Sequence, residues 1–482
     1  MNVTRLIAVA AFALALEVPS ALAHPAAAQA TTFTVATTAD APHALPLDGN
    51  CTSTLPGGAC TLRAAIQAAN LLGDGPNTIN LSAPGAYTLS VAGPNEDSSA
   101  TGDLDINGTN VVIANTSGAR VAIDGNRTDR VIGIGRLGPA QVTITGVTIE
   151  NGAIEGAPSP LTAGGGVDIA PGSAATFDNV LFIGNRTVFA GGGLANAGLA
   201  NLNDVTFSGN LAVFSGGYGN LAVTNLTNVV FSGNFGTFSN GAFGNLGLAN
   251  LTDVLITKNA AGYLDGGLGN GDRAAITLTD VTISRNSARV NAGMGTLGKS
   301  TLTNVTISGN TAADFSPGFG NLGTATLTNV TLSGNTGGGN VGGIAGGLPL
   351  KGRLTPVADV LGILSIHVPE PGPTMVQNTI VDSPLAAACA VPVVSLGSNL
   401  EFPGNTCAFS LALGDLIGRP PLLGPLASNG GFAPTHALLA RSPAIDAARS
   451  GCPSTDQRKV ARPQGPRCDI GAYERKKVKK KK

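Results

Sequence analysis

The amino-acid sequence predicts an all-β solenoid, a parallel β-helix, and three observations lead to this fold class. A nine-residue phrase, written LTNVTISGN at 302–310, recurs seven times between Phe177 and Asn335. Its closing asparagines are spaced by 24 to 27 residues, a period that is typical of repeat architectures. Only 12% of the residues are charged and 4% are aromatic, whereas 68 of 482 are Gly, which suits a narrow stacked core.

The alternation inside the phrase predicts two short strands joined at a corner. Leu302 and Asn304 share one parity and Val305 and Ile307 share the other, so we expect the chain to bend after Asn304. Asn and Asp tolerate the left-handed backbone of such a bend. The predicted corner ladder, bonded from coil to coil, is Asn179, Asn228, Asp253, Asp280, Asn304 and Asn329. The predicted core positions include Val281, Ile283, Val305, Ile307, Val330 and Leu332.

Residues 1–30 have the features of a signal peptide. Arg5 precedes an apolar run at Leu6–Leu16 that is too short to span a bilayer. Small-residue cleavage sites follow at 21–23 and 28–30, and the second is preferred because a strand-like segment begins directly after it. No later stretch is apolar enough for a membrane helix. We therefore expect a secreted protein, released from the cell or displayed on its outer surface.

The rest of the chain divides into five segments. Residues 31–135 form an N-terminal cap and irregular first coils, 136–340 the regular repeats, 341–388 irregular coils, 389–474 a closing segment and 475–482 a basic tail. Within the cap, 61–70 has helical composition, and Leu62, Ile66, Ala69 and Leu72 on one face suit a helix across the open end of the solenoid. The tail is a weak signal for polyanion binding and is more often a solvated end, so nucleic-acid binding is not expected.

The six cysteines suit an exported protein and fall in three close pairs outside the repeats. We interpret them as local disulfides that staple the ends: Cys51 with Cys60, Cys389 with Cys407, and Cys452 with Cys468. The densest polar cluster lies near the C-terminus and comprises Asp446, Asp456, Arg458, Arg462, Arg467, Asp469 and Glu474. Ion pairs and side-chain-to-backbone bonds that seal the last coil are favoured for this cluster over a lyase-like Arg-Pro site at Arg462.

Both ends of the chain resemble those of one bacterial family. The segment Cys60–Ile66, followed by Ala68–Asn70, resembles the CSLREA motif of secreted bacterial β-helix proteins, and Asp103–Ile106 also fits. The segment from Ser442 to Glu474 resembles their choice-of-anchor C-terminal domain, and the repeats are similar to those of polymorphic outer-membrane proteins. The resemblance covers nearly the whole mature chain. It implies a right-handed parallel β-helix that is exported and, in most members, has no assigned reaction.

The chain departs from this family at three places. Ala64 stands where members carry the Glu that completes a capping box with Thr61. Ala448 and Lys459 stand where the closing motif usually has Gly, which puts those turns in doubt. The sequence ends in lysines, whereas members often continue into a hydrophobic sorting segment. Anchoring by that route is therefore not predicted.

Parallel β-helices include polysaccharide lyases and glycosidases, so an enzyme has to be weighed. Asp253 and Asp280 are the nearest paired carboxylates, but Asn fills the same corner in other coils, which marks them as turn formers. The Gly-rich stretches between phrases recur once per coil, which favours a structural role over phosphate loops. No catalytic, cofactor-binding or metal-binding residue is predicted.

We expect a non-catalytic solenoid whose Thr/Ser/Asn face serves adhesion or binds glycans or other surface polymers. The alternative is a polysaccharide lyase or glycoside hydrolase with its site in the irregular coils at 100–135 or at the break at 337–374. An autotransporter passenger is less favoured, because no barrel-like strands follow the repeats.

Overall fold

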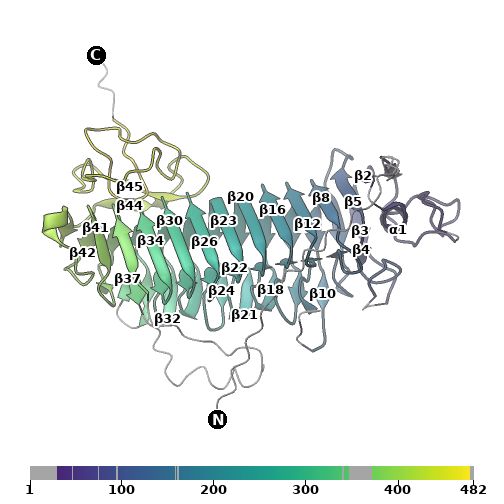
Figure 1. The fold of residues 1–482 in the computed structure, drawn as a ribbon, viewed down its shortest axis with the longest axis horizontal. Coiled ribbons are helices and arrows are strands. Elements are labelled where there is room, and N and C mark those ends of the chain that lie inside the picture. The colour runs from purple at the N-terminus through teal and green to yellow at the C-terminus, as the bar shows by residue number, and fades with distance from the viewer. Residues whose placement is uncertain are drawn as a thin grey trace, which may run out of the picture.

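The computed structural model describes residues 30–477, apart from 46, 74, 94–95, 158, 160–161, 339–340 and 347–371. Most of the predicted signal peptide, most of the predicted break at 337–374 and the tail beyond residue 477 lie outside the described residues. The chain forms the right-handed parallel β-helix that the repeats predict, with stacked strands along one long axis (Figure 1).

The largest sheet has 24 strands in two ranks that meet at the predicted corner. The first rank comprises β1(Thr32–Val35), β2(Pro76–Leu81), β5(Asn110–Asn115), β8(Gln141–Thr145), β12(Ala174–Asp178), β16(Leu199–Asn203), β20(Val223–Ser232), β23(Leu248–Thr257), β26(Ala275–Thr279), β30(Lys299–Thr303), β34(Thr324–Thr328), β38(Thr374–Gln377) and β41(Val394–Gly397). Strands β20 and β23 continue through the corner and belong to both ranks. The rest of the second rank comprises β3(Gly85–Thr88), β6(Val121–Asp124), β9(Thr148–Glu150), β13(Leu181–Ile183), β17(Thr206–Ser208), β27(Thr282–Ser284), β31(Thr306–Ser308), β35(Thr331–Ser333), β39(Ile380–Asp382), β42(Leu400–Phe402) and β43(Leu416–Ile417).

Two further parallel sheets close each coil. The 8-stranded sheet comprises β10(Ala153–Ile154), β14(Arg186–Thr187), β18(Leu211–Phe214), β21(Phe235–Ser239), β24(Ala260–Ala261), β28(Ser287–Val290), β32(Thr311–Phe315) and β36(Thr336–Gly337). The 11-stranded sheet comprises β4(Leu104–Ile106), β7(Ile132–Ile134), β11(Val167–Ile169), β15(Leu194–Asn196), β19(Tyr218–Asn220), β22(Phe243–Asn245), β25(Leu268–Asn270), β29(Met294–Thr296), β33(Phe319–Asn321), β37(Val341–Gly346) and β40(Ala387–Cys389).

The core is the narrow column that the strand parity predicts. Val281, Ile283, Val305, Ile307, Val330 and Leu332 are all fully buried. Farther toward the N-terminus, Phe182, Phe207 and Phe231 occupy the same column and stack at centroid distances of 4.6 and 4.8 Å. These spacings match the ~4.8 Å separation of neighbouring strands, so each ring packs on the ring of the next coil.

The predicted corner residues lie at the corner and in register, but only some of the coil-to-coil bonds expected between them form. The six predicted residues have positive φ angles between 53° and 59° and stand in register. Coil-to-coil bonds of this ladder join Asn304 Nδ2 to Asp280 Oδ1 (3.0 Å) and Asn378 Nδ2 to Asn329 Oδ1 (3.3 Å). The continuous buried amide ladder forms instead at the closing asparagines Asn185, Asn210, Asn234, Asn259, Asn286, Asn310 and Asn335. The closing position is buried in every coil, so these amides must bond one another.

The N-terminal cap contains the expected helix, α1(Leu62–Leu72), at one end of the solenoid (Figure 1). Thr61 accepts a hydrogen bond from the Ala64 backbone N–H through Oγ1, and the first turn has no acidic residue, so the capping box is incomplete. Ile66 is fully buried, but Leu72 is 43% exposed, so the buried face is narrower than predicted. Arg63 is also buried there, because Asp40 pairs with it at 2.7 Å.

The closing segment has two parts. Residues 389–417 supply the last strands of the stack, β41, β42 and β43, and Cys407 and Phe409 there are buried in the main core. The later part, which carries the predicted polar cluster, lies on the flank of the solenoid and not over its last coil, which corrects the sealing role expected for that cluster. After the short helix η3(Leu411–Leu413), the antiparallel pair β44(Leu423–Ala427) and β45(Thr435–Leu438) turns back beside the sheet (Figure 1). Gln457 then bonds Thr282 (2.6 Å) and Thr306 (2.6 Å) on the second rank. The polar outer face of β27 and β31 therefore binds the chain's own C-terminal part.

The Gly-rich stretches have a structural role, as expected. A Cβ built on Gly269 would lie 1.9 Å from Asn240 Oδ1 of the preceding coil. A Cβ on Gly241 would lie 2.2 Å from the Gly266 carbonyl oxygen. Backbones and polar side chains approach here more closely than any other residue type allows.

Candidate functional site

The strongest candidate site is the outward face of four neighbouring first-rank strands. Because side chains alternate along a strand, every second residue of β16, β20, β23 and β26 points to solvent while the others fill the core. One-to-one pairing between these strands sets the outward residues in three columns along the axis. The columns are Leu199, Val223, Leu248 and Ala275; Asn201, Asn225, Asn250 and Thr277; and Asn203, Thr227, Thr252 and Thr279. We call these twelve residues the strip.

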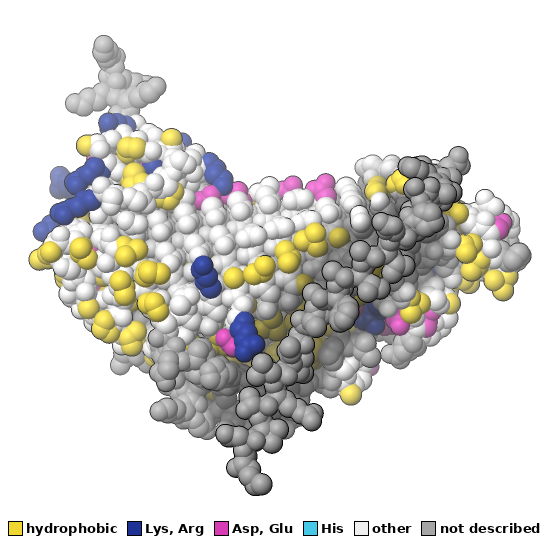
Figure 2. All heavy atoms as spheres, viewed as in Figure 1, with side chains coloured by type: hydrophobic (Ala, Val, Ile, Leu, Met, Phe, Trp, Pro, Cys, Tyr) yellow, Lys and Arg dark blue, Asp and Glu magenta, His cyan; other side chains and the backbone are white. Residues whose placement is uncertain are grey.

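The first column of the strip is aliphatic and open to solvent. Leu199 and Val223 are each 38% exposed and Leu248 is 53% exposed. Figure 2 shows hydrophobic side chains in a row along the axis, with an uncharged surface beside the row. Aligned exposed aliphatic side chains are unfavourable in water without a partner, so the row marks a contact surface.

The second column is an amide ladder on the surface. Asn225 Nδ2 donates to Asn201 Oδ1 at 2.9 Å, and Asn250 Nδ2 donates to Asn225 Oδ1 at 3.0 Å. Asn225 and Asn250 each use one of their two N–H groups in this ladder, so a second donor and a free lone pair remain on Asn225. The bonds hold the amides in one orientation before any ligand arrives. Threonines take over this column from Thr277 onward.

The strip is uncharged and is bounded by charges. Asp178 on β12 and Lys299 on β30 stand at its two ends along the axis. The corner beside the third column carries Asp204 and Asp253, both with a φ of 54°. Acidic side chains accordingly line one rim of the uncharged surface in Figure 2. Asp253 is paired with Lys459, but a polyanion would meet the Asp204 carboxylate, so the rim favours a neutral ligand.

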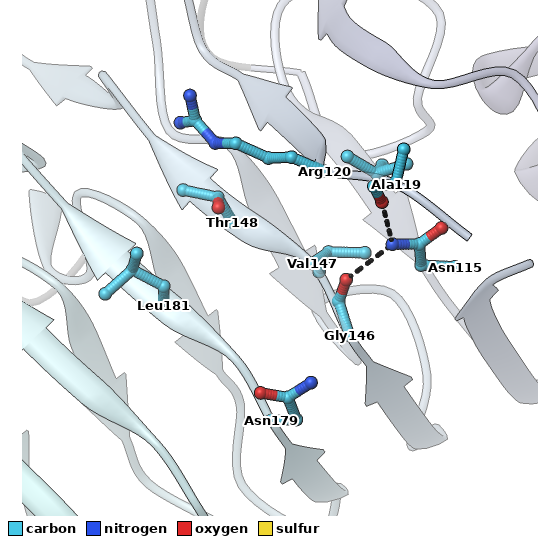
Figure 3. Close-up of a pocket in the computed structure, with 9 residues that line it drawn as sticks. Asn115, Ala119, Arg120, Gly146, Val147, Thr148, Asn179 and Leu181 are labelled. Carbon is cyan, nitrogen blue, oxygen red and sulfur yellow. Dashed lines mark hydrogen bonds between the residues drawn. The ribbon is translucent and has the colours of Figure 1, made fainter. Parts of the chain in front are cut away.

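A shallow hollow of about 370 Å³ opens at the corner nearer the N-terminus (Figure 3). Asn115 donates from Nδ2 to the carbonyl oxygens of Ala119 (2.8 Å) and Gly146 (3.0 Å), which ties down the loop after β5. Arg120 and Thr148 lie on one side of the hollow and Asn179 on the other. The Arg120 guanidinium pairs with Glu150 at 2.7 Å. The hollow lacks paired free carboxylates, so it offers a contact for hydroxyl groups and no acid–base pair.

The irregular coils at 100–135 contain buried acids and arginines. Asp103 pairs with Arg130 at 3.1 Å, and Asp105 on β4 is fully buried with no hydrogen-bond partner for Oδ1. Burial raises the pKa of Asp103 to about 6, and burial together with the nearby Asp103 charge raises the pKa of Asp105 to about 8. Perturbed carboxyl groups often mark active sites. Here both side chains are enclosed, so a polymer on the surface cannot touch them in this arrangement.

The predicted C-terminal polar cluster comes together through ion pairs and bonds to the backbone. Arg458 pairs with Asp456 at 2.6 Å, and Arg462 pairs with Glu474 at 3.2 Å. Asp469 accepts from the Asp446 backbone N–H at 2.7 Å, and burial raises the pKa of Asp469 to about 6. The Arg467 backbone N–H reaches Asp446 at 3.4 Å. The cluster therefore organises the closing segment, as expected, although on the flank.

Lys459 connects this segment to the corner ladder. Its Nζ lies 2.5 Å from Asp280 Oδ2 and 3.1 Å from Asp253 Oδ2. Burial raises the pKa of Asp280, and the two carboxylates raise the pKa of Lys459 against the effect of its own burial. The backbone of Lys459 has a φ of 64°, a left-handed conformation that Gly adopts most easily. Asp253 and Asp280 are thus engaged in a structural ion pair.

All three predicted disulfides form, joining Cys51 to Cys60, Cys389 to Cys407 and Cys452 to Cys468. Among the described residues, no group of three His, Cys, Asp or Glu side chains is arranged to hold a metal ion. Within the same part of the chain, no helix has the length and apolar character to cross a membrane.

Comparisons with known proteins leave the family open. No protein-family model and no curated protein matches the chain. Among solved structures, the crystal structure of pectate lyase Pel9A is similar, with a TM-score of 0.46 and 15% sequence identity over 92% of this chain and 97% of that one. Membership of the CSLREA family remains a prediction from the two end motifs.

Sequence reasoning missed the strip, although the signal was present. The repeated phrase begins one residue after Asn201, Asn225 and Asn250, so the amide column lies just outside it. Extending the phrase by three residues toward the N-terminus aligns Leu199, Val223 and Leu248 as well.

Proposed function

We propose that this protein is an exported, non-catalytic β-solenoid that binds a neutral surface polysaccharide through the strip. The observation that carries this function is the pairing of an exposed aliphatic column with a surface amide ladder, without charge, on one face. Sugar rings present C–H faces and hydroxyl edges, and the two columns are complementary to these two features. The threonines of the third column add hydroxyl donors and acceptors.

Export and family membership belong to this proposal. Three disulfides suit an oxidising compartment, which supports secretion. The helix capped by Thr61 begins within the segment that resembles the CSLREA motif, and it lies at the end of the solenoid, where a cap is expected. These features support the CSLREA and choice-of-anchor assignment as a hypothesis.

A polysaccharide lyase or glycoside hydrolase is the alternative, and the described carboxylates disfavour it. Asp103 and Asp105 are enclosed, whereas Asp253 and Asp280 hold Lys459. A hydrolase needs two carboxyl groups that reach the same glycosidic bond. The arrangement therefore supports binding over catalysis.

The test combines binding and degradation. The purified mature protein is applied to a glycan array and, in parallel, incubated with polysaccharides while released reducing ends and unsaturated products are measured. We expect retention of neutral glycans without product. Asn225→Lys should weaken retention by about tenfold or more, whereas Thr237→Lys, an exposed change on the 8-stranded sheet, should not. Product release that disappears in Asp103→Asn would instead establish an enzyme.

A further inference from the structure

We infer that the strip binds the planar face of an ordered, crystalline polysaccharide composed of neutral β-linked chains, and not a single soluble chain. This inference rests on the proposed function and specifies its ligand. Four features of the strip support it: its lattice, its open surface, its pre-ordered side chains and its lack of charge.

The strip is a regular two-dimensional lattice. From Leu199 to Thr328 the first-rank strands pair residue by residue without a shift. Along the axis the side chains therefore repeat at ~4.8 Å, and across it at ~6.8 Å, the rise of two residues in a strand. The 8-stranded sheet has register shifts at Ala212/Phe214 and Ala288/Val290, so the lattice is interrupted on that side. An unbroken lattice suits a ligand that repeats in two directions.

The strip is an open face of the sheet, and Figure 2 shows no hollow in it. One edge is formed by the small residues Gly198, Ala222, Gly247 and Ala274, and the other by the corner. None of the twelve strip residues is aromatic or charged. Sites for soluble ligands are concave and bury most of the ligand surface. A single flexible chain on this face would be contacted on one side only while losing conformational freedom, whereas chains in a crystal are already ordered.

The polar groups of the strip are ordered before binding. The bonds between Asn201, Asn225 and Asn250 fix three amide planes along the axis, so little side-chain entropy is lost on contact. In such a chain each bond polarises the next, which strengthens the outward donors and acceptors. The exposed leucines beside them have few rotamers and contribute by burial of apolar area. An array of fixed side chains suits a ligand whose own groups are fixed, as they are on the face of a crystalline polysaccharide.

The absence of charge narrows the chemistry of the ligand. Between Asp178 and Lys299 the outward first-rank positions are neutral, and the corner rim carries the carboxylate of Asp204, while Asp253 on the same rim is paired with Lys459. Uronic-acid polymers would approach this rim against like charge. Uncharged β-linked glucans and N-acetylated glycans meet no such opposition.

Co-sedimentation separates the possibilities. The full-length mature protein is mixed with microcrystalline cellulose or crystalline chitin, and the soluble hexasaccharide of the same sugar is added as a competitor. We expect sedimentation with one crystalline polymer and no release by its hexasaccharide. Asn225→Thr, which breaks both bonds of the surface amide ladder, should weaken binding, and Asn225→Lys, which also adds a charge, should lose about tenfold or more. Thr237→Lys is the matched control on another sheet, and thermal melts of all variants show that each is folded.

Two outcomes would overturn the inference and can be told apart. If the soluble hexasaccharide competes as strongly as the crystal binds, the ligand is a single chain, and the proposed function survives without this refinement. If neither crystalline nor soluble neutral glycan binds, the proposed function fails as well. Equal loss of binding in Asn225→Lys and Thr237→Lys would show that the contact does not involve the strip.

Discussion

Asn234 provides a sharp test of the buried amide ladder, because the same coil carries a matched exposed amide. The Asn234 side chain donates to Asn259 Oδ1 (2.9 Å) and to the Phe207 carbonyl (3.0 Å). Its Oδ1 accepts from the backbone N–H (3.1 Å) and Nδ2 (2.9 Å) of Asn210. Both asparagines are 1% exposed. Asn225, nine positions earlier, makes two ladder bonds on the surface.

The expected magnitude follows from the groups left without partners. Asn234→Ala removes the acceptor for two buried donors of Asn210, each of which costs about 1–3 kcal/mol when unsatisfied. The free energy of unfolding should therefore fall by about 2–6 kcal/mol. Asn225→Ala exposes its former partners to water and should change this free energy by no more than about 0.5 kcal/mol.

Urea unfolding followed by circular dichroism measures the difference between the two variants. Because solenoid coils interact mainly with their neighbours, hydrogen exchange at the Asn210 amide gives a local reading of the same change. Exchange there should accelerate in Asn234→Ala and stay unchanged in Asn225→Ala. Equal stability of the two variants would refute the claim that burial makes this ladder indispensable.

The remaining predictions concern the core, the cysteines and the buried acids. Ile307→Asp should lower the free energy of unfolding by several kcal/mol, because it buries an unpaired carboxylate in the column, and a melting temperature equal to the parent's would contradict the strand parity. Reduction should speed hydrogen exchange in 31–75 and 440–474 before the central coils at 177–335, since each outer disulfide supports a segment at the periphery of the stack; uniform loss of protection would argue against this. The folded-state pKa values of Asp103 and Asp105, about 6 and about 8, exceed the ordinary value of ~3.9. The folded state therefore binds more protons than the unfolded state between these values. The free energy of unfolding should fall as the pH rises from ~4 through 8. The melting temperature of the double variant Asp103→Asn/Asp105→Asn should depend less on pH across this range than that of the parent. A parent melting temperature that rises with pH would show that the two carboxyl groups are not held protonated.

The strand parity and the corner were accessible from the sequence because each depends on local rules. Val305 and Ile307 alternate around one bend, and Asn304 tolerates a positive φ, so both follow from neighbouring residues alone. The pairs Cys51–Cys60 and Cys452–Cys468 were equally local, because each closes a short loop.

The repeat spacing could not predict which faces of the solenoid are buried or covered by another part of the chain. Asn210 and Asn228 are similar in sequence context, yet Asn210 is buried in the ladder while Asn228 sits at the corner. The position of the closing segment depends on contacts such as Gln457 with Thr306, which join residues 151 apart. No local sequence pattern encodes such a contact, so the position of the closing segment on the flank could be seen only in the structure.

The closing segment also explains why one polar face is free to bind and another is not. The motifs at Thr282–Ser284 and Thr306–Ser308 resemble Thr206–Ser208 in sequence, but the first two contact Gln457 and His436. The second rank is thus occupied by the chain itself over these coils. The first-rank strip remains uncovered, with Leu248 at 53% exposure and the Asn225 amide bonded only to its own column. Because the C-terminal part covers the second rank over these coils and not the strip beside it, the strip stays open as an extended surface on which an ordered polymer can lie.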